Sequence, residues 1–254
     1  MVRKYSTPFL KEVIVRLDFA SPVTRLAKAL PQKLTKVISP LFPIGEPKQF
    51  IGKELMVSKD ATKERVLQGT DWYFHSIDKQ KTLIVAQDNV NISYKTYASF
   101  DIVNQDFLPI VEALFSSYDD FQGRRIGLRY RNEISLSEAN VLDWTDYLDR
   151  RLLAFFDFPE DPKRICRAFN NLELNYGDFI ARFQYGMLNP DYPAPVRRKS
   201  FTLDYDAYRQ GPQDFEDVKQ NMNKFHDAIQ KLFEQSITDR LRSLMGVEGD
   251  GQER

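Results

Sequence analysis

The chain has 254 residues, which suits one large domain or two small ones, and its 36 basic and 36 acidic residues cancel. No overall field therefore draws it to nucleic acid or to an anionic membrane. The single cysteine, Cys166, excludes an intrachain disulfide and a cysteine-based structural zinc site. No run approaches the roughly 18 apolar residues of a spanning helix, and the N-terminus has no signal-like apolar core, so we expect a cytoplasmic protein.

The first half of the chain predicts a strand, a helix, three antiparallel strands and a second helix. Apolar and polar residues alternate over 12–19, as in a strand with one buried face. A helix is expected over 21–38, because Ser21 and Pro22 supply a cap and a first-turn proline. Residues 39–62 are rich in proline and glycine and predict a connection. The remaining elements are expected as a short strand at 54–57, strands at 64–78, 82–87 and 90–97, and a helix at 101–118.

The second half repeats this order, starting from a central strand over 124–134. There Ile126, Leu128 and Tyr130 alternate with glycine and arginine. The following elements are expected as a helix at 137–156, strands at 163–174, 178–188 and 199–208, and a long amphipathic helix at 214–245.

Residue matches support a duplication, although chance resemblance between apolar elements is the rival explanation. The segment from Val13 to Leu17 matches the segment from Ile126 to Tyr130 at an offset of 113 residues, and the two predicted helices match at an offset of 118. We therefore predict an α+β fold: a duplicated strand-helix-three-strand-helix unit, with antiparallel sheets covered by helices on one face and a long C-terminal helix. The predicted units are 1–122 and 123–245, followed by a disordered tail at 246–254.

Three motifs resemble those of a family: Tyr5-x-x-Pro-x-x-x-Glu-Val-Ile, the central Gly123-Arg-Arg-Ile-Gly-Leu-Arg-Tyr-Arg-Asn, and His226-x-x-Ile-x-x-x-Phe-Glu-x-x-Ile-Thr. The family is a sporadically distributed group of uncharacterised prokaryotic proteins of similar length. The resemblance spans nearly the whole chain and is most specific in the central motif. It implies no activity and no catalytic residues, and its patchy distribution points to mobile or defence-associated loci.

Catalytic constellations are not found in the sequence. The glycines at 123–127 lack the lysine and the serine or threonine of a phosphate-binding loop, and there is no nucleophile elbow and no paired histidine and cysteine. Asp143, Asp146 and Asp149 are spaced to bind a divalent cation from one helix face, but a solvated face is the stronger interpretation. His226 and His75 are interpreted as packing or hydrogen-bonding histidines.

The arginines of the central strand are the best binding candidates. Arg125, Arg129 and Arg131 are expected to project from one face, with Arg16 joining them from the first strand. With nearby tyrosines they could hold a phosphate or stack on a base. The alternative, which we favour, is that they form cross-strand ion pairs with Asp18, Glu133 or Asp204.

These observations predict a non-catalytic binding or protein-interaction module with no cofactor and no metal site. A protein partner or self-association is expected, and no membrane is. Two alternatives stay open: nucleic-acid or nucleotide binding through the arginine-bearing face, and a metal-dependent hydrolase that uses the aspartates.

Overall fold

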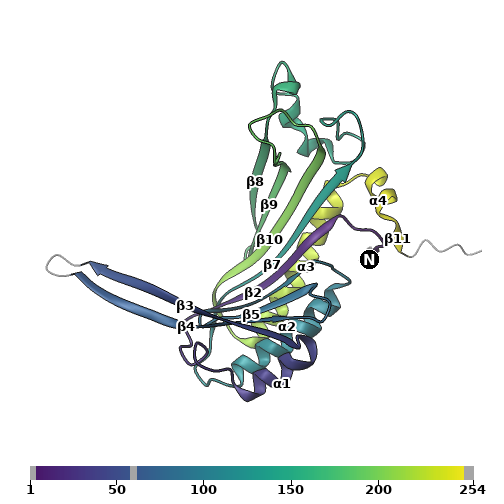
Figure 1. Cartoon of the computed structure of the whole chain (residues 1–254). Coiled ribbons are helices and arrows are strands. Elements are labelled where there is room, and N and C mark those ends of the chain that lie inside the picture. The colour runs from purple at the N-terminus through teal and green to yellow at the C-terminus, as the bar shows by residue number, and fades with distance from the viewer. Residues whose placement is uncertain (1–3, 58–61, 249–254) are drawn as a thin grey trace, which may run out of the picture. The chain divides into compact units, whose positions relative to one another are not determined.

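The computed structural model describes residues 4–57 and 62–248, and within them the chain is an α+β protein dominated by an antiparallel sheet of nine strands (Figure 1). The strands of this sheet are β2 (Leu10–Phe19), β3 (Ile44–Val57), β4 (Thr62–His75), β5 (Lys81–Val85), β6 (Asn89–Tyr94), β7 (Gly123–Leu136), β8 (Ala168–Asn175), β9 (Ile180–Met187) and β10 (Lys199–Gln213). A separate pair joins β1 (Lys4–Tyr5) to β11 (Val247–Glu248). The helices are α1 (Gln32–Leu41), α2 (Phe100–Phe115), α3 (Phe215–Ser236) and α4 (Asp239–Met245), with 3-10 turns η1 (Arg150–Leu152), η2 (Ala154–Phe156) and η3 (Pro162–Arg164).

The chain divides into two compact units, neither of which is continuous in sequence. We call residues 14–127 and 209–222 the ribbon unit, and residues 4–13, 128–208 and 223–248 the pocket unit. Strands β2, β7 and β10 and helix α3 each contribute residues to both units. The predicted boundaries at 122 and 245 remain predictions. Of the predicted tail, residues 249–254 lie outside the described residues, whereas Val247–Glu248 form β11.

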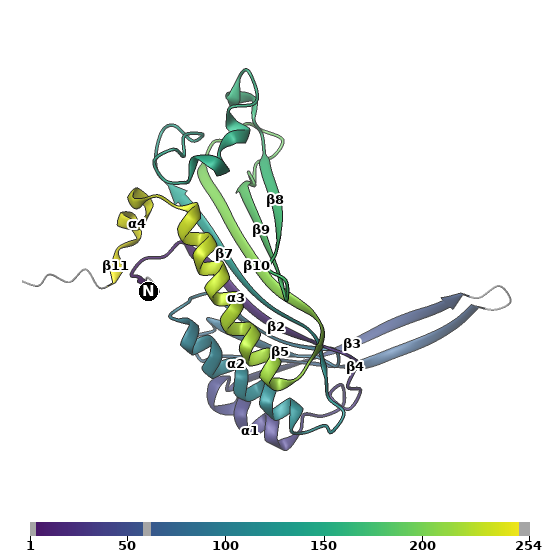
Figure 2. The ribbon, with the colours of Figure 1, turned by 180° about the vertical axis from the view of Figure 1, so that it is seen from behind.

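The ribbon unit confirms the strands and the second helix expected from its sequence. The alternation in β2 buries Val15 and Leu17, as a one-faced strand requires. Helix α2 begins after Ser99, whose side chain accepts a hydrogen bond from the backbone N–H of Ile102. Helices α1 and α2 lie side by side (Figures 1 and 2). Phe107 on α2 is fully buried, so this helix supplies part of the apolar core of the unit.

The first helix starts eleven residues later than the predicted 21–38 helix. Residues 24–28 form turns instead, in which the backbone N–H groups of Lys28 and Ala29 both donate to the carbonyl of Arg25. Pro31 then precedes the first helical residue, and a proline disfavours helical geometry in the residue before it. The predicted start was wrong because the stronger helix-breaking signal lay further along the chain.

The predicted connection at 39–62 was wrong over 44–57, because these residues form β3, and its residues 58–61 lie outside the described residues. Pro47 lies inside this strand, opposite Trp72 on β4. A proline has no N–H for a sheet ladder, but β3 is the edge strand of the sheet and one of its sides has no neighbour. The edge position therefore permits a strand where the sequence predicts a loop.

The pocket unit buries an aromatic core against strands β9 and β10. The ring of Phe183 stacks on that of Tyr205, with centroids 4.5 Å apart and an interplanar angle of 6°. Phe201 packs on Trp144 at a centroid distance of 5.3 Å, and Phe225 on α3 is fully buried. Burying a large side chain contributes roughly 1.5–3 kcal/mol each, so these rings are a main source of stability for the unit.

The helix predicted at 137–156 was wrong. This segment forms turns and two 3-10 turns, because asparagine and aspartate side chains bind the backbone two residues further on. The acceptors are Asn140 to the N–H of Leu142, Asp143 to that of Thr145 and Asp149 to that of Arg151, at donor–acceptor distances of 2.9–3.3 Å. These local bonds replace the helical hydrogen bonds that the apolar spacing predicts.

The long helix predicted at 214–245 is broken after Ser236. Thr238 caps α4 by accepting from the N–H of Leu241, and its own N–H donates to the carbonyl of Tyr147. Ile237 forms a β-bridge with Leu148. A contact with a distant segment therefore interrupts a helix whose local sequence is continuous. Among the helices of the described residues, none is long and apolar enough to cross a membrane.

Candidate functional site

The predicted arginines divide between the two units, and ion pairs involve three of them: Arg16, Arg129 and Arg131. In the pocket unit, Arg129 on β7 donates from Nε and Nη2 to the two carboxylate oxygens of Asp204 on β10, at 2.8 and 2.5 Å. This bond, followed by the charges of Asp206 and Glu12, raises the pKa of the guanidinium. Arg129 thus lies among three carboxylates, which reduce the positive potential that it presents to a phosphate.

Neighbouring strands continue the same alternation of charge. Arg182 on β9 lies opposite Asp206 on β10 and opposite Glu173 on β8. Its Nε donates to a Glu173 oxygen at 3.0 Å. Opposite charges that face each other across strands stabilise the pairing of a sheet. These three side chains therefore form an ion-pair ladder across β8, β9 and β10: Glu173, Arg182 and Asp206.

The other three predicted arginines also lie next to groups of their own strands. Arg131 reaches Glu133 at 3.9 Å, and Arg16 in the ribbon unit donates to Asp18 at 2.6 Å. The guanidinium of Arg125 lies across Gly127, where an added Cβ would be 3.0 Å from its Nη1. A ligand-binding role for Arg16, Arg125, Arg129 and Arg131 remains a prediction.

Both histidines take part in hydrogen bonding. His226 Nδ1 lies 3.2 Å from the hydroxyl of Tyr130, which is mostly buried. His75 Nδ1 lies 3.0 Å from the hydroxyl of Thr82, and its Nε2 is 3.7 Å from Glu46. Each ring therefore binds neighbouring side chains, as expected for structural histidines.

The aspartates at 143, 146 and 149 do not form the helical row that a metal site on this segment requires. Asp143 accepts from both the N–H and the hydroxyl of Thr145, which lowers its pKa. Asp149 accepts from Arg151, which lowers its pKa as well. Within residues 4–57 and 62–248, no three His, Cys, Asp or Glu side chains are grouped to hold a metal ion.

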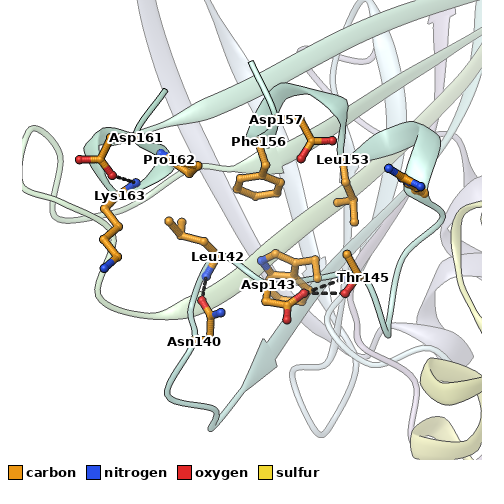
Figure 3. Close-up of a pocket in the computed structure, with 12 residues that line it drawn as sticks. Asn140, Leu142, Asp143, Thr145, Leu153, Phe156, Asp157, Asp161, Pro162 and Lys163 are labelled. Atoms are coloured by element: carbon orange, nitrogen blue, oxygen red, sulfur yellow. Dashed lines mark hydrogen bonds between the residues drawn. The ribbon is translucent and has the colours of Figure 1, made fainter. Parts of the chain in front are cut away.

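A cavity of about 610 Å³ lies in the pocket unit, between the turns of residues 140–163 (Figure 3). Its apolar lining comes from Leu142, Trp144, Leu153, Phe156 and Pro162. Its charged lining comes from Asp143, Arg150, Asp157, Asp161 and Lys163. An apolar surface with a few polar groups is typical of pockets that bind small molecules.

The turns that replace the predicted helix shape this cavity. The side chain of Asp161 accepts from the N–H of Lys163, just as Asn140 and Asp143 accept from the residues two positions ahead (Figure 3). A regular helix would point its side chains outward in all directions from one axis. Successive turns instead allow residues of one short segment to line several sides of a cavity.

A buried cation lies beneath the tryptophan of the cavity. Lys199, 4% exposed, donates to Glu138 at 2.5 Å, and its Nζ lies 5.3 Å from the centroid of the Trp144 ring and 5.0 Å from that of Tyr147. Tyr147 also donates to Glu138. The bonds from Lys199 and then Tyr147 lower the pKa of this carboxylate. The cation therefore lies within cation–π distance of the Trp144 ring and helps to hold it in place.

The sequence alone does not predict this cavity, because the apolar spacing over 137–156 favours a helix. The available signal was the repeated placement of asparagine and aspartate, with Pro159 and Pro162 nearby, which favours turns over a helix. Comparison with protein-family models and with curated proteins gives no match. The family resemblance of the three motifs therefore stays a prediction.

Proposed function

We propose that the protein is a non-catalytic interaction module that binds a protein partner through the ribbon formed by β3 and β4. The observation that carries this proposal is the extent of the ribbon beyond the sheet (Figure 1). Strand β4 pairs with β5 only from Trp72 to His75, whereas β3 and β4 pair with each other out to Val57 and Thr62. Beyond Phe50, seven cross-strand pairs, from Ile51–Gln68 to Val57–Thr62, have no third strand among the described residues. We call these seven pairs the outer ribbon.

Such a ribbon has little means of stabilising itself. A two-stranded hairpin is marginal in water unless a third strand or another layer covers it. Ile51, where the outer ribbon begins, is 76% exposed. The sequence of the outer ribbon contains six large apolar residues: Ile51, Leu55, Met56, Val57, Val66 and Leu67. At about 3.3 Å per residue the outer ribbon is about 23 Å long, which is enough to lie along a partner's surface.

A second copy of this chain is the partner that we propose. The chain carries no net charge, so copies do not repel one another at long range. The outer ribbon contains both signs of charge in its sequence, at Lys53, Glu54, Lys63, Glu64 and Arg65. Two copies in antiparallel arrangement can therefore match opposite charges, as in a two-fold interface.

The test shortens the ribbon and keeps its base, which is the part of β3 up to Gly52 and of β4 from Leu67. Residues 53–66 are replaced by Asn-Gly, which joins Gly52 to Leu67 across a register that already pairs them. Light scattering after size exclusion should show a dimer for the full chain at about 100 µM and a monomer for the shortened chain. Circular dichroism should show equal folding of both.

A matched pair of substitutions separates a specific contact from general stickiness. Ile51→Lys should weaken the dimer by about tenfold or more, because it places a charge in the contact. Ile77→Lys changes an equally exposed isoleucine, 82% exposed, outside the ribbon and should leave the dimer unchanged. A monomeric full chain, or a shortened chain that still dimerises, would refute the proposal.

The arginine-bearing face is not favoured as a nucleic-acid site, because Arg129 and Arg182 are each surrounded by carboxylates. A duplicated origin of the two halves is an inference supported by the strand order. In the sheet, β2 lies next to β6 and the meander β6-β5-β4-β3, and β7 lies next to β10 and the meander β10-β9-β8. In both halves the meander is followed by a helix, α2 or α3.

A further inference from the structure

The nine-stranded sheet ends in β8, which has no strand on its outer side among the described residues. Figures 1 and 2 show β8 at the outer edge of the meander β10-β9-β8. The strand at the other end of the sheet, β3, carries Pro47 and Lys48, residue types that hinder the pairing of a further strand. The sequence of β8, from Ala168 to Asn175, contains no proline, lysine or arginine. The edge of β8 is therefore open to an added strand.

The direction of the backbone groups of β8 follows from its pairing with β9. The N–H of Tyr176 donates to the carbonyl of Phe179 at 3.0 Å, and the register is continuous along the whole of β8. In an antiparallel pair, alternate residues direct their N–H and C=O groups to the neighbouring strand. The residues of β8 that direct these groups outward are therefore Phe169, Asn171 and Glu173. They form a row of donors and acceptors for a further strand.

On one face of the meander, the ion-pair ladder ends at β8. Its charges alternate from Asp206 to Arg182 to Glu173. The side chain of Glu173 is 51% exposed, so part of its carboxylate is open beyond its bond to Arg182. Opposite charges on neighbouring strands stabilise their pairing, so a basic residue on an added strand continues the alternation.

Apolar side chains also reach the edge. On the other face, Phe183 stacks on Tyr205, and Leu172 lies opposite Phe183 and is 44% exposed. Phe169, on the same face as Glu173, lies opposite Gly186 and is 43% exposed. Apolar residues of an added strand, opposite Leu172 and Phe169, remove this surface from water.

The length of the edge favours a short segment of another protein over a second copy of this chain. Strand β8 has eight residues, whereas a stable interface of standard size contains about 20–30 residues on each side. An extended peptide that joins a sheet edge gains main-chain hydrogen bonds along its length, and side chains on alternate faces supply its specificity.

We propose that β8 binds an extended segment of a partner protein as an added antiparallel strand, in the direction that β9 and β10 already follow. The segment places a basic residue opposite Glu173 and apolar residues opposite Leu172 and Phe169. Because it runs antiparallel to β8, its sequence from the N-terminus is basic-apolar-x-x-apolar. This edge adds a peptide-binding function to the proposed self-association through the ribbon.

The probe is the fluorescein-labelled peptide Thr-Thr-Lys-Val-Thr-Thr-Val-Thr, and fluorescence anisotropy follows its binding to the full chain. Its lysine is placed for Glu173, its first valine for Leu172 and its second valine for Phe169. Binding should approach saturation at about 1 mM protein. Replacing the lysine by glutamate should weaken binding about threefold or more, because like charges then face each other across the strands.

A pair of N-methylated peptides distinguishes strand addition from other kinds of binding. The threonine opposite Asn171 directs its N–H toward β8, whereas the next threonine, opposite Asn170, directs its N–H away. N-methylation of the first threonine should weaken binding about fivefold or more, because a main-chain hydrogen bond is lost. N-methylation of the second should change the affinity by less than about twofold, since no bond to β8 is lost.

A pair of substitutions tests the same bond from the side of the protein. Asn171→Pro removes an outward N–H of β8 and keeps the bonds to β9, since an edge strand accepts proline where the N–H faces outward. It should weaken binding of the peptide about fivefold or more. Asn171→Ala is the matched control, because it keeps the N–H, and should bind as wild type does. Circular dichroism compares the folding of both variants, and the N-methylated peptides test the bond without any change to the protein.

Three results would overturn the proposal. The first is no binding of the peptide at about 1 mM protein. The second is equal affinity of the two N-methylated peptides. The third is a dimer of the full chain that Asn171→Pro converts to a monomer, which would make a second copy the occupant of this edge. The chain with the shortened ribbon should bind the peptide as the full chain does, so failure of the ribbon proposal leaves this test unchanged.

Discussion

Arg129 and Asp204 form a two-point contact between β7 and β10, in which Nε–Oδ1 is 2.8 Å and Nη2–Oδ2 is 2.5 Å. The carboxylate side chain is 8% exposed, whereas the guanidinium side chain is 40% exposed. The contact therefore lies between a buried ion pair and a surface one. It gives the most basic strand of the sequence a structural function in the sheet.

Asp204→Asn should lower the free energy of unfolding by about 1–2 kcal/mol, because the paired charge is lost and Asp204 is buried. The estimate is below that for a fully buried pair, since solvent screens the exposed guanidinium. Chemical denaturation followed by circular dichroism measures the change. Arg131→Ala is the control, because Arg131 and Glu133 are 3.9 Å apart and both more than a third exposed. If the control lost as much stability, the assignment of Arg129–Asp204 as the principal ion pair would be wrong.

Acid should weaken the cluster beneath the cavity. Hydrogen bonds from Lys199 and Tyr147 hold the pKa of Glu138 below its ordinary value of 4.5. The stabilisation from a carboxylate with a lowered folded-state pKa is fully present above 4.5 and is lost as the pH falls through the folded-state pKa. The melting temperature of wild-type protein should therefore decrease as the pH is lowered below 4.5.

Glu138→Gln should lower the melting temperature at about pH 7, where Lys199 loses its counter-charge, and the gap to wild type should be smaller at about pH 3. Glu133→Gln removes a carboxylate elsewhere in the unit and serves as the control at both pH values. A gap between wild type and Glu138→Gln that is the same at both pH values would contradict the linkage.

The base of the ribbon, where Gly69 on β4 pairs with Phe50 on β3, should not tolerate a larger residue than glycine at position 69. A Cβ there would lie 2.8 Å from the Cβ of Ala27 and 2.9 Å from the ring of Phe50. Gly69→Ala should therefore lower the free energy of unfolding by about 1–3 kcal/mol. Gly45→Ala is the matched control in β3, since its Cβ would come no closer than 3.4 Å to the ring of Phe74. Equal unfolding free energies of the two variants would show that the base of the ribbon is not tightly packed.

The hydroxyl of Tyr205 should contribute measurably to the pocket unit. It donates to Ser236 Oγ at 2.9 Å, and burial raises the pKa of Tyr205 so that the donor stays protonated. Tyr205→Phe should cost about 0.5–1.5 kcal/mol of unfolding free energy, since Ser236 still donates to the carbonyl of Leu232. Tyr176→Phe, at a residue 41% exposed, should cost less than about 0.5 kcal/mol. Denaturant titration of both variants decides the matter.

Local patterns were enough to predict those elements whose signals have no competitor elsewhere in the chain. The alternation from Ile126 to Tyr130 predicted β7, and the apolar spacing after Ser99 predicted α2, because one buried face imposes its period on the residues. Residue types alone favour an ion pair for Arg129 and include Asp204 among its partners, and the structure shows this pair. Periods of two residues in a strand and about 3.6 residues in a helix are properties of a few consecutive residues, so they can be recognised without knowing the fold.

Features that depend on partners distant in sequence could be found from the folded structure alone. Pro47 is accommodated because β3 is an edge strand, and the long helix breaks where Ile237 meets Leu148. The cavity exists because short polar side chains bind their own backbone while Trp144 packs on Phe201, 57 residues further along the chain. Apolar spacing predicts a helix wherever nothing else competes for the backbone. The competition between local turns and distant packing is settled by the whole fold.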